Sequence, residues 1–141
     1  MILFLSLLAL LNSFQPSTAI RDAKIKIENA WVRPDGKGMN SALYFNISNN
    51  GMKTDDLYKI TSTSAELVQM HETIIKNGLA EMKEVKSVSI PTNMLVEFKP
   101  GGYHVMLIGL KKDLKAGEKI IFFFYFKRAG RIRLSATVKQ N

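Results

Sequence analysis

Short apolar segments separated by turn residues follow one another along this chain, and this pattern constrains the fold more than any other feature. None of them has the 3.6-residue period of an amphipathic helix, whereas residues 24–31 alternate polar and apolar side chains like a half-buried strand. The segments expected to form strands are residues 24–31, 41–47, 56–60, 65–75, 80–85, 94–98, 103–108, 119–126 and 131–138. Some eight or nine strands at this spacing, in a chain of 141 residues, predict one all-β domain with a Greek-key sandwich or barrel fold.

The first 19 residues differ from the rest because they contain no charged side chain. Residues 2–11 are almost wholly apolar, and Ser17 and Ala19 occupy the positions that signal peptidase favours before its cleavage site. A membrane anchor is the alternative, but the apolar stretch is shorter than the roughly 20 residues that a membrane-spanning helix needs. We therefore expect residues 1–19 to be a signal peptide and residues 20–141 to form an exported domain.

The expected domain is strongly basic, since the chain has 20 Lys and Arg against 12 Asp and Glu and a formal net charge of +8. Nucleic acid is not an expected partner of an exported chain. The charge points instead to an acidic protein or to transient contact with a membrane surface that carries anionic lipid. The chain contains no cysteine, so no disulfide can stabilise it in an oxidising compartment, and stability must come from a β core.

Both histidines of the chain fall in one pattern with two methionines: His71, ten residues, Met82, twenty-one residues, His104, one residue, Met106. Neutral imidazole and thioether groups suit the soft ion Cu(I), whereas Mg²⁺, Ca²⁺ and Zn²⁺ gain little from an uncharged sulfur. Methionine accounts for 7 of 141 residues, so chance would place one at both offsets from the histidines in about one case in 400. The sequence therefore predicts a Cu(I) site formed by these four side chains.

The first two of these residues lie on the two arms of a predicted β-hairpin. Asn77 and Gly78 are typical of a two-residue hairpin turn, and such a turn sets Thr73 opposite Met82. His71 and Met82 then become diagonal neighbours on one face, roughly 7–8 Å apart at Cα. Two long side chains at that separation can converge on a single ion.

The other two residues, His104 and Met106, are two positions apart in another predicted strand, so both side chains project from the same face. The two pairs form one site only if the fold brings the hairpin next to this strand, an adjacency that the spacing does not supply. Trp31 is expected in the core, with shielding of the copper site as the alternative, and Met39 and Met70 are expected to pack against other residues rather than to bind metal.

The chain resembles the periplasmic copper chaperones (PCu(A)C-like) that deliver Cu(I) to the CuA centre of cytochrome c oxidase. The resemblance covers residues 30–138 and is most specific in Met70-His71-Glu72, Met82 and Lys99-Pro100-Gly101-Gly102-Tyr103-His104-Val105-Met106-Leu107-Ile108-Gly109-Leu110-Lys111-Lys112. It implies a cupredoxin-like Greek-key fold that binds Cu(I) near the surface through His71, Met82, His104 and Met106. It also implies a copper acceptor protein as partner, a cytochrome c oxidase subunit, in the periplasm.

Two differences from that family concern additional copper ligands. Many relatives have methionines where this chain has Thr73 and Ala80, so an auxiliary thioether is not expected. Some relatives carry a tail rich in histidine and methionine, whereas residues 139–141 contain neither, so no Cu(II) site is expected there.

Other classes of function fit the composition less well. A blue-copper electron-transfer protein and a thiol-disulfide reductase both need cysteine, and a hydrolytic Zn²⁺ site needs histidine or carboxylate ligands rather than methionine. We therefore do not expect an enzyme. The alternative that remains is a metal-free secreted β-sandwich that binds a protein or polysaccharide partner.

Overall fold

The computed structural model describes residues 24–140, which form ten strands. The strands are β1 (Ile25–Val32), β2 (Ser41–Asn49), β3 (Asp55–Thr61), β4 (Ala65–Lys76), β5 (Leu79–Glu84), β6 (Val88–Ile90), β7 (Leu95–Phe98), β8 (Tyr103–Leu110), β9 (Lys119–Phe126) and β10 (Gly130–Val138). The all-β prediction is confirmed, and among residues 24–140 no helix could cross a membrane. The predicted signal peptide, residues 1–19, and the domain start at Ile20 lie outside the described residues.

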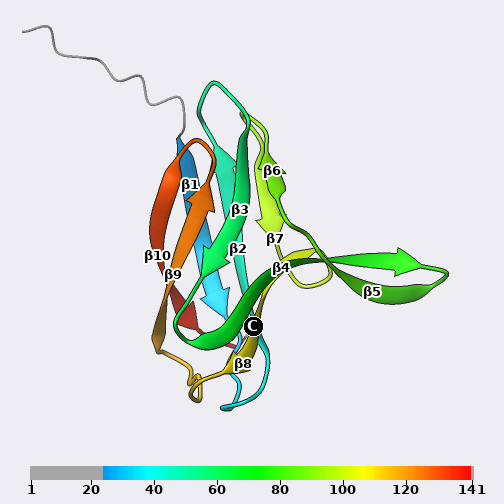
Figure 1. Ribbon diagram of the computed structural model, residues 1–141, viewed down its shortest axis with the longest axis vertical. Helices are drawn as coiled ribbons and strands as arrows, with labels where there is room; N and C mark the ends of the chain where they lie inside the picture. The colour runs from blue at the N-terminus through cyan, green and yellow to red at the C-terminus, as the bar shows by residue number, and fades with distance from the viewer. Residues whose placement is uncertain (1–23, 141) are drawn as a thin grey trace, which may run out of the picture.

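The strands form one sheet in the order β5-β4-β8-β7-β2-β1-β10-β9-β3-β6, and β8 also pairs with β2. The sheet folds back on itself, because Phe45 on β2 contacts Phe124 on β9 although β1 and β10 lie between these strands in the sheet (Figure 1). Their ring centroids are 5.0 Å apart. The predicted Greek-key sandwich or barrel is therefore the observed architecture.

The interior is filled by alternate side chains of the strands. On β9, Phe122, Phe124 and Phe126 are buried, whereas Phe123 and Tyr125 lie on the opposite, partly exposed face. Burial of each large apolar side chain contributes about 1.5–3 kcal/mol relative to exposure. A core of this kind supplies a rigid scaffold in a chain without disulfides.

The hairpin formed by β4 and β5 projects beyond the body of the molecule (Figure 1). Every residue of β5 is exposed, and β5 pairs only with β4. Asn77 and Gly78 both have positive φ, 52° and 76°, as a type I′ turn requires. The observed register sets Thr73 opposite Met82, as the turn predicts.

Three local features differ from the sequence-based expectations. Strand β6 was not expected, because three residues are too short to show a period; it is held by pairing with β3. Trp31 is partly exposed rather than interior, since a β-bulge after Glu28, with Asn29 at a φ of 54°, shifts the alternation of β1. Met39 is 56% exposed because it lies in the connection between β1 and β2. The expected packing of Met70 is confirmed by its 5% exposure.

The buried carboxylate of Asp55 is expected to stabilise the fold through the hydrogen bonds that it accepts. Its two oxygens accept hydrogen bonds from the backbone N–H groups of Asp56, Arg128 and Ala129 at 2.8–2.9 Å. Asp55→Ala leaves these three groups without their acceptor, and we expect it to lower the free energy of unfolding by about 2–4 kcal/mol in urea denaturation.

The matched control is Asp56→Ala on the same strand, where the carboxylate is partly exposed and makes only a 3.9 Å ion pair with Lys127. That substitution should cost less than about 1 kcal/mol. Equal losses in the two variants would show that the Asp55 hydrogen bonds do not stabilise the fold.

Candidate metal centre

The two predicted ligand pairs meet because β4 pairs antiparallel with β8. The register sets His71 directly opposite His104 and Gln69 opposite Met106. The imidazole ring centroids of the two histidines are 5.7 Å apart, with the rings inclined at 67°. The hairpin that carries His71 and Met82 is therefore next to the strand that carries His104 and Met106. The two ligand pairs lie side by side in one sheet and do not face each other from two sheets.

A tight turn between β7 and β8 fixes the position of His104. Residues 99–102 form it, with a hydrogen bond from Gly102 N to Lys99 O at 3.0 Å and a φ of 82° at Gly101. Proline at the second position and glycine at the third are typical of a type II turn, in which the third residue requires positive φ. The Gly102 carbonyl then accepts hydrogen bonds from Thr73 N at 3.2 Å and from His104 Nδ1 at 3.0 Å.

Each histidine is oriented by an oxygen acceptor at one ring nitrogen. His104 donates from Nδ1 to the Gly102 carbonyl, and His71 donates from Nε2 to the side-chain oxygen of Gln69 at 3.0 Å. The remaining nitrogens, His104 Nε2 and His71 Nδ1, are buried and have no hydrogen-bond partner among the described residues. An unsatisfied buried polar atom costs about 1–3 kcal/mol, so a metal ion that accepts both lone pairs would relieve that cost.

Met82, His104 and Met106 line one hollow of about 260 Å³. Tyr44 and Pro100 form part of its wall. Met82 is 65% exposed because it lies on the projecting hairpin, whereas His104 is only 3% exposed. His71 is not among the lining residues; it is placed beside the hollow through its pairing with His104. The arrangement combines a buried imidazole with a thioether at an open edge.

The electrostatics of the site favour neutral ligands. The pKa of His71 lies below its usual value of 6.5, first because burial disfavours the charged ring and second because His104 lies close by; Glu84 opposes the shift. At neutral pH the ring of His71 is therefore unprotonated and can donate a lone pair. No group of three histidines or carboxylates suited to a metal occurs among residues 24–140. The available donor set is thus imidazole and thioether, which favours Cu(I) over Zn²⁺.

Gln69 is the site residue that the sequence analysis missed. It is two residues before His71 in a strand, so the alternation of side chains placed both on one face. That spacing was the available signal, but a glutamine on an exposed strand face is common and carries no metal chemistry of its own.

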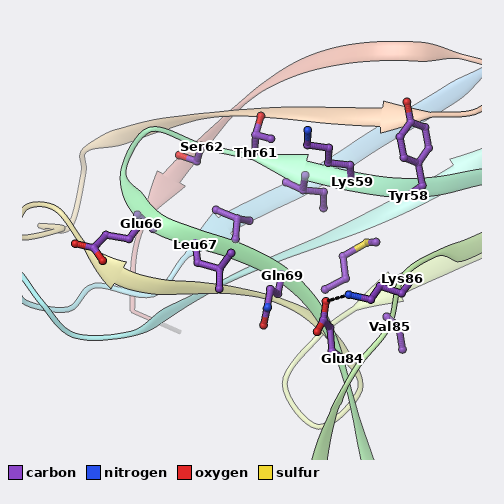
Figure 2. A pocket seen from close by; sticks show the side chains of 14 residues that line it. Tyr58, Lys59, Thr61, Ser62, Glu66, Leu67, Gln69, Glu84, Val85 and Lys86 are labelled. Carbon is purple, nitrogen blue, oxygen red and sulfur yellow. Dashed lines mark hydrogen bonds and ion pairs between the residues drawn. The ribbon is translucent and has the colours of Figure 1, made fainter.

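A second hollow, of about 400 Å³, lies between β3 and β4. Figure 2 shows Tyr58, Lys59 and Thr61 on one side and Leu67 and Gln69 on the other. Its lining contains no histidine, so it does not offer the donor set of the metal site. Gln69 connects the two regions, since it lines this hollow and also accepts the hydrogen bond from His71.

Comparison with protein families and curated sequences gives consistent matches. Residues 25–138 match the family described as "Putative lipoprotein LpqE-like". The chain is 37% identical over 116 residues to "Putative lipoprotein Lxx21020" of Leifsonia xyli subsp. xyli and 36% identical over 110 residues to "Uncharacterized protein RP573" of Rickettsia prowazekii. These alignments cover 82% and 74% of this chain, and 69% and 61% of the two relatives.

Solved structures with the same fold include copper-binding domains. The copper-bound PCuAC domain from PmoF2 superimposes with a TM-score of 0.70 at 27% identity, over 84% of this chain and 94% of that domain. The Cu(I) form of DR1885 from Deinococcus radiodurans gives a TM-score of 0.60 at 28% identity, over 78% of this chain and 77% of that one. The expected cupredoxin-like fold is thereby confirmed.

The environment of His71 predicts how the pKa of its ring differs between the metal-free protein and two variants. His71 should titrate below pH 6.5; Glu84→Gln should lower its pKa further, and His104→Gln should raise it toward 6.5. Ring resonances followed by NMR measure each value. A His71 pKa above 6.5, or the opposite order of the variants, would contradict this description.

The same shift makes stability depend on pH. The unfolded chain takes up the His71 proton at a higher pH than the folded chain, so the contribution of His71 to stability is complete above pH 6.5 and is lost as the pH falls through the lowered pKa.

Proposed function

This chain belongs to the LpqE-like family, and we propose that it is an extracytoplasmic copper chaperone that binds one Cu(I) and passes it to an acceptor protein. Support comes from the solved structures with the same fold, which include the copper-bound PCuAC domain of PmoF2 and the Cu(I) form of DR1885. We assign His71, Met82, His104 and Met106 as the copper ligands of this chain.

The observation that carries the proposal is the pair of buried imidazole nitrogens that have no hydrogen-bond partner among residues 24–140, one of them on His104, which lines a hollow together with Met82 and Met106. Gln69 and Gly102 accept the protons of the opposite nitrogens, so in the neutral rings the lone pairs of His71 Nδ1 and His104 Nε2 are the ones left for a metal ion. Neutral sulfur and nitrogen donors stabilise Cu(I), because Cu(II) prefers harder donors in tetragonal geometry. The site therefore suits a carrier that keeps its cargo reduced.

Transfer to an acceptor follows from the unequal exposure of the ligands. Met82 is exposed and lies on a hairpin arm whose strand pairs only with β4 among residues 24–140, so an incoming ligand can replace its sulfur first. His104, anchored by the turn at residues 99–102, releases the ion last. The exchange moves Cu(I) from one ligand set to another with no change in oxidation state, so we expect no enzymatic step.

The acceptor that we propose is a cytochrome c oxidase subunit with a CuA centre, and the compartment is the periplasm. The family resemblance of residues 30–138 and the predicted export signal support this assignment. The names of the family and of the Leifsonia xyli relative include the word lipoprotein, which fits a protein exported to the cell envelope.

The proposed ligands predict how the purified chain takes up metal. One equivalent of Ag(I), a redox-inert mimic of Cu(I), should shift the NMR resonances of all four assigned ligands, and Zn²⁺ should produce little response. The double substitution Met82→Leu and Met106→Leu should keep the fold and weaken binding by about 100-fold or more, because it removes both sulfur donors.

The matched control is Met52→Leu with Met94→Leu, two exposed methionines outside the site. This variant should bind Ag(I) like the original chain. Unchanged affinity in the Met82 and Met106 variant would show that these sulfurs are not ligands, and equal losses in the two variants would point to non-specific binding by thioethers.

A further prediction concerns Gln69, which accepts the hydrogen bond from the His71 ring. Gln69→Leu removes the oxygen that holds the proton on Nε2 and should weaken Ag(I) binding by about 10–100-fold. Gln69→Glu retains an oxygen acceptor and should restore most of the affinity. Nitrogen-15 NMR should show His71 protonated on Nε2 in the original chain and a mixture of tautomers in Gln69→Leu; a Gln69→Leu variant with unchanged affinity and tautomer would be inconsistent with this role.

A further inference from the structure

Basic and aromatic side chains alternate on the outer face of β3, β9 and β10. Across the three strands, Lys59 is opposite Tyr125, and Tyr125 is opposite Arg131. In the next such row Phe123 is opposite Arg133. The guanidinium carbon of Arg131 lies 4.9 Å from the ring centroid of Phe123, and Lys59 Nζ lies 5.3 Å from that of Tyr125. Lys59 and Arg131 therefore each lie over an aromatic ring of β9.

The positive charge of this face is not neutralised within the protein. The ion pairs of residues 24–140 use Lys26, Lys86, Lys99, Lys112 and Lys127. Lys59, Lys119, Arg131 and Arg133 are all exposed and have no carboxylate within ion-pair distance among those residues. These four cations equal half of the net charge of +8.

We propose that this face, which we call the basic face and define by Lys59, Lys119, Phe123, Tyr125, Arg131 and Arg133, binds the surface of a bilayer containing anionic phospholipid. A bilayer surface presents a plane of phosphate groups, and basic residues near it are attracted to anionic lipid. Tyr125 between the cations can enter the headgroup region, where tyrosine is enriched.

The shape of the basic face favours a lipid surface over a protein segment. Phe123, Arg131 and Arg133 lie on regular strands and line neither of the two hollows described above, whereas Lys59 lines the hollow between β3 and β4. Neither hollow is lined by residues of β9 or β10, so this larger part of the basic face offers no such pocket to a projecting peptide side chain, and a bilayer surface needs none.

The basic face also leaves the metal centre free. In Figure 1, β9 and β10 lie on the left of the molecule, and the hairpin of β4 and β5 that carries His71 and Met82 projects to the right. Contact of a membrane with the part of the basic face on β9 and β10 would therefore leave the open edge of the site accessible to an acceptor. The lipid contact itself does not depend on copper binding.

Co-sedimentation of the full exported chain with vesicles tests the proposal. Vesicles of phosphatidylglycerol and phosphatidylcholine should bind the chain, and the binding should weaken with added salt; pure phosphatidylcholine vesicles should not bind it. The double substitution Arg131→Gln and Arg133→Gln should reduce the affinity by about tenfold or more. Lys111→Gln with Lys112→Gln removes the same charge from an exposed loop after β8 and should have a smaller effect.

Two results would overturn the proposal. Equal losses in the two double variants would mean that net charge rather than the basic face drives binding. Absence of binding to the anionic vesicles, with or without binding to polyglutamate, would mean that the face does not recognise lipid, and polyglutamate binding would identify an acidic protein as the partner. Ag(I) uptake, measured on the same variants, should be unchanged, so failure of the copper proposal and failure of this one are separately visible.

Discussion

The antiparallel pairing of β4 with β8 is the constraint on which the metal centre depends. This pairing sets His71 opposite His104, while the pairing of β4 with β5 sets Met82 diagonal to His71. Strand β4 thus has one histidine-bearing neighbour and one methionine-bearing neighbour. Because side chains alternate with a period of two, a shift of one residue between β4 and β8 would turn His104 and Met106 to the opposite face from His71, and the same shift between β4 and β5 would turn Met82 away.

The site combines rigidity and access in different residues. His104 is buried and tied through the Gly102 carbonyl to a turn that also accepts a hydrogen bond from β4, so its ring is fixed before any ion arrives. Met82 lies on β5, an exposed hairpin arm that pairs only with β4 among the described strands. A buried imidazole at the base and an exposed thioether at the edge suit an ion that must be bound and then released.

Local parts of this arrangement were predictable from the sequence, and the long-range part was not. The Asn77-Gly78 turn determined the hairpin register correctly, because a two-residue turn allows one pairing. The pairing of β4 with β8 depends on how the whole sheet curves, and the local alternation of polar and apolar residues does not reveal it. The partial exposure of Trp31 was not predicted, because a one-residue bulge in β1 reverses the alternation of side chains after it. The role of Gln69 was not predicted, because it depends on the orientation of the His71 ring.

The most direct test of this account is a crystal structure of the Cu(I)-loaded chain with anomalous diffraction measured at the copper edge. The account predicts a single strong peak within bonding distance of His71 Nδ1, His104 Nε2 and the sulfurs of Met82 and Met106. A peak at any other position, or coordination through the opposite nitrogen of either histidine, would contradict the claim that two prearranged lone pairs and two thioethers form the site.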